Sequence, residues 1–306
     1  MSEKVLRRTT FSGRLLHFGE EKEIDQKTAI GKGLIYMTLD IIIVLAVSCS
    51  LFLWFSGSGI NPYERAMPCG DFSIQQPFKE NTVGLKHLLV VTLGSPFLIV
   101  ALVEAILHYK SKGSNRLAKF FSATTITYLK YLVVYAGCTF AMEFLKCYVG
   151  RLRPHFFSVC KPDWSKVDCT DKESYIDPSD LVCTNPNPRK IRTARTSFPS
   201  GHTAAAVHVF LFVALYLRRM ARNTGIKEII TVKRILVPLY AVWTLFCAVT
   251  RVTDNWHFPT DVLGGVILAI VFIYPAFRRS WSSSAIIYGT RKIQPGDFRD
   301  DSKKDE

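Results

Sequence analysis

The sequence predicts an all-α integral membrane protein in which six transmembrane helices form a bundle. Hydrophobic residues make up 48% of the 306-residue chain, and they gather in long apolar stretches flanked by polar or basic segments, as bilayer-spanning helices require. The polar linkers offer too little amphipathic surface to enclose six apolar helices in a soluble core. The six stretches lie near residues 34–55, 87–107, 126–145, 203–217, 235–250 and 262–277.

We expect one membrane domain, residues 34–277, between two polar tails, residues 1–33 and 278–306. The first apolar stretch starts well inside the chain and has no small-residue cleavage site, which indicates a retained helix and not a removed signal peptide. The second stretch contains Gly94-Ser95-Pro96, an interruption with no counterpart in the other half of the chain.

The distribution of basic residues predicts that both tails are cytoplasmic. By parity, one side holds 24 Lys and Arg and the other holds 12, and the richer side faces the cytoplasm under the positive-inside rule. The extracytoplasmic loops are then about 57–86, 147–199 and 253–261. The net charge of +14 mostly reflects this topology, and no basic module of the kind that binds nucleic acid is present.

Four cysteines fall in these outward loops, where oxidation to disulfides is chemically accessible. The sequence leaves their connectivity open. They are Cys69, Cys160, Cys169 and Cys183.

The first of three polar clusters on this face is "KCYVGRLRP", which carries Lys146, Arg151 and Arg153. One interpretation is a charged flank in contact with lipid headgroups, since Lys and Arg snorkel at membrane interfaces. However, positive charge here opposes the positive-inside bias, and Pro154 restricts Arg153 to extended conformations. A fixed guanidinium fork suits a phosphate.

The second cluster is "PSGH", at the start of the fourth apolar stretch. Ser200 can cap the helix, Gly201 lets a ligand approach the backbone, and the free amides with the helix dipole form an anion site. His202, taken alone, is also typical of a structural or interfacial histidine.

The third cluster, "TRVTDNWHFPTD", contains Arg251, His257 and Asp261. Pro259 suits a first helical position, so His257 should precede the sixth helix and Asp261 should lie in its first turn. The aspartate could then accept from one imidazole nitrogen and leave the other nucleophilic. A loop histidine beside a capping aspartate is the alternative.

Together, K-x6-R-P at 146–154, P-S-G-H at 199–202 and R-x5-H-x3-D at 251–261 resemble the three-part signature of the type 2 phosphatidate phosphatase superfamily. "GRLRPHFFSVCKPDWSK" and the six-span layout look like the animal lipid phosphate phosphatases, and the resemblance covers roughly residues 30 to 280. One position departs from the pattern: Thr250 stands where the family usually has serine.

The resemblance implies that His257 attacks phosphorus and forms a phosphohistidine, with Asp261 orienting the ring. His202 would protonate the departing lipid alkoxide and then activate water. The phosphate oxygens would be held by Lys146, Arg153, Arg251 and the backbone amides around Ser200 and Gly201. No metal ion or other cofactor is implied.

The implied activity is hydrolysis of lipid phosphate monoesters by catalytic loops on the non-cytoplasmic face. The class includes phosphatidate, lysophosphatidate, sphingosine 1-phosphate and ceramide 1-phosphate, and the preferred lipid stays open. The partners are the bilayer and the lipid substrate. We expect a plasma-membrane enzyme with an extracellular site, with Golgi or endoplasmic reticulum membranes as alternatives. Gly265 and Ala269 form a small-xxx-small pair that suits helix packing within a chain or in a homo-oligomer.

Three other classes of protein are alternatives. The cations could bind phosphate without cleaving it, in an anion or phosphate transporter, although transporters place substrate near the midplane in repeated halves. A catalytically silent membrane scaffold is disfavoured because both histidines are present. A metal site built from His202, His257 and Asp261 is disfavoured because neighbouring cations would repel a metal ion.

Overall fold

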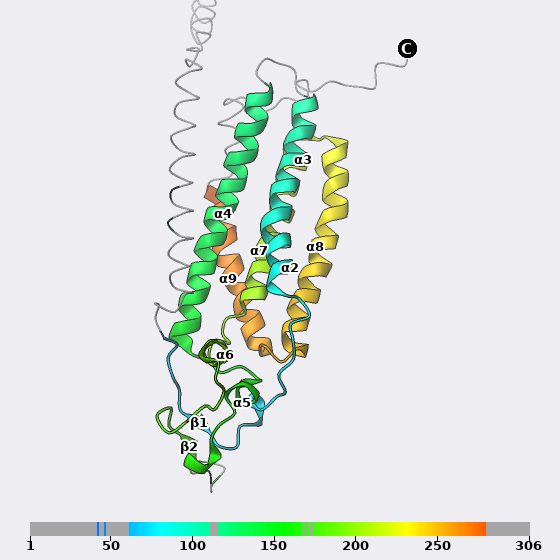
Figure 1. The fold of residues 1–306 in the computed structure, drawn as a ribbon. Helices are drawn as coiled ribbons and strands as arrows, with labels where there is room; N and C mark the ends of the chain where they lie inside the picture. Colours follow the sequence, from blue (N-terminus) through cyan, green and yellow to red (C-terminus); the bar gives the residue numbers. More distant parts are fainter. Residues whose placement is uncertain are drawn as a thin grey trace, which may run out of the picture.

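The computed structural model describes residues 61–110, 116–167, 169, 171 and 174–279, together with Ile42 and Ala46. The described chain is mostly helical: long helices run side by side, and shorter elements gather at one end of them (Figure 1). The first predicted span, 34–55, lies outside the described residues apart from Ile42 and Ala46, which are helical.

Five helical segments in the described part of the chain are long and apolar enough to cross a membrane, and each contains one of the predicted spans. The first is formed by α2 (Leu85–Leu89), a π-helical turn η3 (Val90–Gly94) and α3 (Ser95–Lys110). The others are α4 (Arg116–Val149), α7 (Gly201–Thr224), α8 (Lys227–Thr253) and α9 (Pro259–Arg279). The prediction of an all-α membrane bundle is confirmed for these five.

Helix α7 is the central helix of the bundle. Two-thirds of its most apolar window (67%) is buried inside the protein, against 22 to 33% for the other four segments. Its buried face supplies Val209, Phe212, Val213 and Leu217 to the main apolar core. Because the "PSGH" sequence opens this helix, the second polar cluster is placed at the centre of one end of the bundle.

The Gly94-Ser95-Pro96 interruption does not break the second span. The chain passes through it as a π-helical turn, and hydroxyl groups from α4 satisfy the carbonyls that such a turn exposes. The Tyr131 hydroxyl donates to the Thr92 carbonyl at 2.5 Å, and the Tyr128 hydroxyl donates to the Leu93 carbonyl at 2.9 Å. The helix therefore continues through the interruption, and α4 hydrogen-bonds two of its carbonyls.

The loops 61–84 and 150–199 fold together into a small cap over one end of the bundle. The cap contains β1 (Met67–Pro68) paired antiparallel with β2 (Tyr175–Ile176), and its own apolar core. Its short helices are η2 (Phe72–Ile74), α5 (Phe156–Cys160), η4 (Trp164–Lys166) and α6 (Pro188–Ala194).

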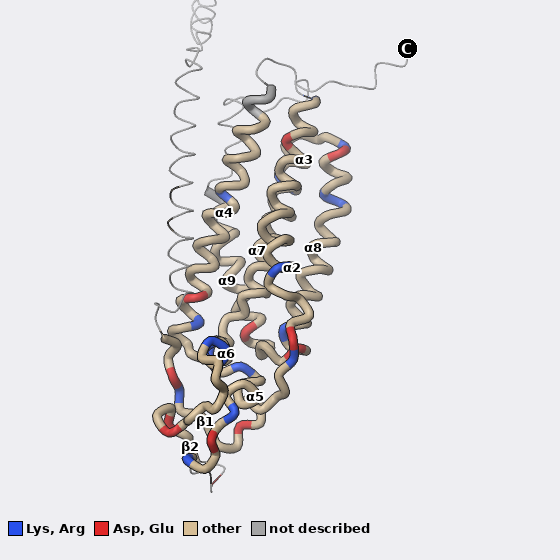
Figure 2. The backbone as a smooth tube through the Cα atoms, in the orientation of Figure 1, with Lys and Arg blue, Asp and Glu red and all other residues tan. Residues whose placement is uncertain are grey.

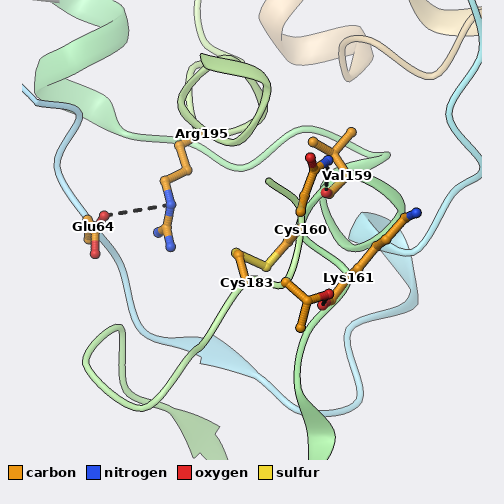
Figure 3. The surroundings of a disulfide bond; sticks show 8 residues. Glu64, Val159, Cys160, Lys161, Cys183 and Arg195 are labelled. Atoms are coloured by element: carbon orange, nitrogen blue, oxygen red, sulfur yellow. Dashed lines mark hydrogen bonds and ion pairs between the residues drawn. A yellow bond between two sulfur atoms is a disulfide. The ribbon is translucent and has the colours of Figure 1, made fainter. Parts of the chain in front are cut away.

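Two disulfides hold the cap. Cys69 is bonded to Cys169, which joins the two loops, and Cys160 is bonded to Cys183 within the longer loop. The pairing that the sequence left open is thus defined. Beside the second bond, Arg195 lies 3.7 Å from Glu64 and links the end of α6 to the first loop (Figure 3).

The cap is anchored where α4 ends. The Tyr63 amide donates to the Cys147 carbonyl at 2.8 Å, and the Arg65 Nε donates to the Val149 carbonyl at 2.7 Å. Gly150 has a φ of +57°, and a Cβ atom at this position would lie 1.8 Å from the Tyr63 carbonyl oxygen. Only glycine allows this approach. Charged residues gather mainly in the cap and at the two ends of the helices, whereas the middle of the bundle has few (Figure 2).

Candidate functional site

The three polar clusters of the sequence meet at the end of the bundle beneath the cap. Glycines bring α9 against the start of α7: a Cβ atom on Gly265 would lie 2.6 Å from the Ser200 carbonyl, and one on Gly264 would lie 2.4 Å from the Phe198 ring. The Ser200 amide donates to the Asp261 carbonyl at 2.9 Å. Gly265 of the small-xxx-small pair therefore packs within this chain.

Ser200 is the N-cap of α7, as predicted. Its Oγ accepts from the Thr203 amide at 3.5 Å and from the Thr203 hydroxyl at 3.0 Å. A Cβ atom on Gly201 would lie 3.3 Å from the Lys146 Nζ, so the ammonium group of Lys146 lies beside the first turn of α7. The positive end of the helix and a cation thus share one small volume, which favours an anion.

Lys146 has a partner that sequence reasoning missed. Its Nζ lies 2.7 Å from the Glu143 Oε1, and both side chains are largely buried. Glu143 precedes Lys146 by three residues on α4, so the two lie on the same helix face. The spacing was visible in the sequence. The Glu143 carboxylate holds the Lys146 ammonium at the inner edge of the site. It also offsets one of the positive charges of the site.

Arg153 is buried between the cap and the turn that joins α8 to α9. Its guanidinium lies 4.8 Å from the centroid of the Trp256 ring, and its Nη2 donates to the Thr196 carbonyl at 3.3 Å. Burial lowers the pKa of Arg153 to about 10; the charge of Glu143 opposes this shift and that of Arg251 adds to it. The group remains a cation at neutral pH.

Arg251 is completely buried at the end of α8. Its Nη1 donates to the Asn81 Oδ1 at 2.5 Å, and its Nη2 lies 3.2 Å from the Thr250 Oγ1 and 3.4 Å from the Asp254 Oδ2. Asn81 comes from the first loop, 170 residues away, and no local pattern in the sequence pointed to it.

His257 lies just before α9, which begins at Pro259, and Asp261 occupies its first turn, as predicted. The His257 Nδ1 and the Asp261 Oδ2 are 3.7 Å apart, which is longer than a hydrogen bond. Instead, Asp261 Oδ2 accepts from the Ser197 hydroxyl at 2.6 Å and from the Phe258 amide at 2.9 Å. The Asp261 carboxylate therefore lies beside the imidazole but does not form a hydrogen bond with it.

Arg151 holds the other oxygen of this carboxylate. Its Nη1 lies 2.7 Å from the Asp261 Oδ1 and 2.7 Å from the Thr260 Oγ1, and its guanidinium lies over the Phe258 ring. The cations of the first polar cluster therefore have different neighbours: Arg151 pairs with Asp261, whereas Lys146 and Arg153 lie near His202. The K-x6-R-P spacing selected Lys146 and Arg153, whereas the pairing of Arg151 with Asp261 was not predicted.

The environment of His257 keeps its ring neutral. Burial is the main cause that lowers its pKa to about 3; Asp261 opposes the shift, and the cations Arg153 and Lys146 add to it. A neutral imidazole keeps a lone pair on one nitrogen, which is the form that a nucleophilic role at neutral pH would require.

Several buried nitrogens at the site have no hydrogen-bond partner among the described residues. Buried polar groups are normally paired, and unpaired ones cost free energy. They are Arg153 Nε, His202 Nε2, Arg251 Nε and His257 Nδ1. His202 also lies within electrostatic range of the three other residues and of Lys146. Three cations, a helix N-terminus and unpaired nitrogens together make a site for an anion.

The described residues contain no group of three or more His, Cys, Asp or Glu side chains placed to hold a metal ion. The trio considered from the sequence, His202, His257 and Asp261, therefore does not form such a group.

His155, which follows the first cluster, supports the site from the cap side. Its ring is buried, its Nδ1 donates to the Asn255 carbonyl at 2.7 Å, and its edge meets the Trp256 ring at a centroid distance of 4.9 Å. Trp256 in turn lies against Arg153. Burial is the main cause that lowers the pKa of His155 to about 4; its hydrogen bond opposes the shift and Arg153 adds to it.

We expect His155 to make the fold acid-sensitive. Its pKa is about 4 in the folded protein and 6.5 when unperturbed, so between these values the unfolded chain binds a proton that the folded chain does not. Stability is then lost as the pH falls below 6.5. His155→Asn keeps a donor near the Nδ1 position and does not titrate, so its thermal midpoint should fall less than the wild type's between pH 7 and pH 5. An equal fall in both proteins would contradict this role.

The chain is similar to known proteins over most of its length. Residues 127–284 match the model of the PAP2 superfamily, a range that includes all three clusters. Phospholipid phosphatase 1 of Rattus norvegicus is 32% identical over 257 residues, which cover 78% of this chain and 84% of the relative. Phospholipid phosphatase 2 of Homo sapiens is 31% identical over 240 residues, covering 76% and 78%. No solved structure matches the chain.

Proposed function

The chain belongs to the PAP2 superfamily and is an integral membrane lipid phosphate phosphatase, and we propose that it cleaves phosphate monoesters of lipids through a phosphohistidine intermediate. The observation that carries the mechanism is the meeting of three cations and the N-terminus of α7 around two histidines, His202 and His257. The transporter and scaffold alternatives are not favoured, because the relatives are phosphatases and both histidines lie at the anion site.

In the first step, the Nε2 of His257 attacks phosphorus in line, since its Nδ1 faces Asp261. The N–P bond forms as the P–O bond to the lipid breaks, and His202 donates a proton to the departing alkoxide. The product alcohol leaves as diacylglycerol or the corresponding lipid alcohol. The ring of the phosphohistidine gains positive charge, which the nearby carboxylate of Asp261 stabilises.

In the second step, His202 acts as the base. It takes a proton from water, the water oxygen attacks phosphorus, and the N–P bond breaks to restore His257 and release inorganic phosphate. Lys146, Arg153, Arg251 and the amides at Ser200 and Gly201 hold the phosphate oxygens through both steps. Because these groups supply the positive charge, the proposed reaction requires no metal ion.

The position of the site suits a substrate that stays in the bilayer. α4 ends at Val149, and α7 and α9 begin at Gly201 and Pro259, so the site lies where three spanning segments meet the cap. A phosphate headgroup would enter from the membrane boundary while its acyl chains remain among the helices. We propose the substrates that the family resemblance implies, which are phosphatidate, lysophosphatidate, sphingosine 1-phosphate and ceramide 1-phosphate.

A panel of these four lipids, offered to the purified full-length protein in detergent micelles, tests the function. We expect phosphate release from at least one of them, and the same rate after treatment with a chelator of divalent metals. Release that stops on chelation and returns with a metal ion would contradict the metal-independent chemistry. Absence of release from every lipid would contradict the phosphatase function itself.

We also propose that the site faces the outside of the plasma membrane, in keeping with the charge bias of the loops. Intact cells that express the protein should then release phosphate from an added, membrane-impermeant lysolipid phosphate. Hydrolysis that appears only after permeabilisation would contradict either the orientation or the plasma-membrane location, and tags on the two termini would separate these outcomes.

Thr250→Ser should retain most of the activity. The Thr250 hydroxyl donates to the Cys247 carbonyl at 2.8 Å and accepts from Arg251, and serine supplies the same hydroxyl from the same helix position. A loss in kcat/KM greater than about tenfold, or ~1.4 kcal/mol, would show that the methyl group is needed at this buried position.

A further inference from the structure

A segment of the first loop, residues 76–82, crosses the turn between α8 and α9 and is bonded to it along its length. The Trp256 Nε1 donates to the Lys79 carbonyl at 2.9 Å, and the Lys79 Nζ donates to the Thr253 carbonyl at 2.8 Å. At its start, the Gln76 amide donates to the Pro154 carbonyl at 2.8 Å. This segment is thus fixed to two of the three clusters, although none of the predicted site residues lies in it.

The end of the segment is bonded to the carboxylate next to Arg251. The Thr82 amide donates to the Asp254 Oδ2 at 2.9 Å, and the Thr82 hydroxyl donates to Oδ1 at 3.0 Å. Asp254 is therefore largely occupied by the loop, and its contact with the Arg251 Nη2 is long, at 3.4 Å. The shorter contact to Arg251 is made by Asn81, whose Oδ1 lies 2.5 Å from Nη1.

These contacts account for part of the donor set of Arg251. A guanidinium has five N–H donors. Asn81 accepts from Nη1, and Thr250 and Asp254 accept from Nη2. The Nε has no partner among the described residues and remains available to a ligand.

The acceptor on Nη1 is a neutral amide. A carboxylate in the same place would also orient the guanidinium, but it would set a negative charge beside the bound phosphate and weaken its binding. An amide oxygen fixes the direction of the group and leaves its charge in place.

We propose that Asn81 is a positioning residue that holds Arg251 in the orientation in which it binds the phosphoryl group during transfer. The proposal rests on the proposed function, in which Arg251 contacts the phosphate. Asn81 does not contact the substrate; it acts by orienting the guanidinium of Arg251. The first loop therefore completes the phosphate site and is more than a connection between two spans.

The test compares full-length variants by hydrolysis of a lysolipid phosphate and by affinity for orthovanadate. We expect Asn81→Ala to lower kcat by tenfold or more, because a misdirected donor stabilises the transition state poorly. Asn81→Asp keeps the acceptor, so kcat should return to within about threefold of the wild type while vanadate binds more weakly. Glu80→Ala, at the exposed neighbouring position, should match the wild type in both measurements.

A double-mutant cycle with Arg251→Ala separates positioning from a general structural effect. If Asn81 acts through Arg251, Asn81→Ala should not weaken vanadate binding further in the Arg251→Ala background, whereas independent effects would add. Additive losses, or an Asn81→Asp variant that folds but is as slow as Asn81→Ala, would overturn the proposal. A wild type that hydrolyses no lipid phosphate would instead overturn the proposed function, so the two failures are distinguishable.

Discussion

His257→Ala is expected to abolish turnover, with a fall in kcat of about four orders of magnitude or more, as removal of a covalent nucleophile does in other enzymes. The ring is buried and neutral and lies at the anion site. Binding of orthovanadate should persist in part, because Lys146, Arg153 and Arg251 remain. Both quantities can be measured on the purified variant.

A matched control is His87→Ala, at an exposed histidine near the start of α2 and outside the site. It should retain wild-type turnover. If His257→Ala hydrolysed lysolipid phosphate at the wild-type rate, the assignment of the nucleophile would be wrong even though the phosphatase activity itself would stand.

Asp261→Asn should give the second largest loss, with kcat lowered by orders of magnitude, as for aspartates that orient and stabilise a catalytic histidine, where the loss is about 10⁴. Both oxygens of Asp261 accept hydrogen bonds, from Arg151 on one side and from Ser197 and the Phe258 amide on the other. An asparagine must turn an NH₂ group toward one of these donors, and it also removes the negative charge 3.7 Å from the His257 Nδ1.

Ser197→Ala is the comparison for this variant, because it removes one donor to Asp261 and leaves the charge. Its kcat should fall much less than that of Asp261→Asn. A kcat for Asp261→Asn within tenfold of the wild type would show that the charge of Asp261 does not assist the reaction, and that this residue serves only to join α9 to the cap.

Local patterns predicted the parts of the site that depend on neighbouring residues. Ser200 caps α7 because serine before a helical run can accept from the first-turn amides. Pro259 begins α9 because proline suits the first helical position, and this places His257 just outside the helix. Each of these features is encoded within a few residues, so it was visible in the chain.

The contacts that complete the site join residues far apart in the sequence, and no local sequence pattern predicts them. Asn81 reaches Arg251 across 170 residues, and Ser197 reaches Asp261 across 64. Both depend on how the cap folds over the bundle. The pairing of Cys69 with Cys169 has the same origin, since four cysteines permit three connectivities.

Helix ends show a different limit of the sequence signal. Hydropathy placed the end of the fourth span near residue 217, whereas α7 continues through Arg218 and Arg219 to Thr224 and ends at Gly225, whose φ is +68°. Arginine is a good helix former, so backbone hydrogen bonding continues after the apolar stretch ends. A left-handed glycine then terminates the helix. The length of an apolar stretch thus predicts the part of a helix that lies in the lipid, and the helix itself can be longer.

The most direct test of the mechanism is a rapid quench of the wild-type protein with lysolipid phosphate labelled in its phosphoryl group. We expect a transient covalent label that is acid-labile and base-stable, as a phosphohistidine is, and that maps to His257 and is absent from His257→Ala. A label on Ser200, or full turnover with no covalent label at any quench time, would contradict it.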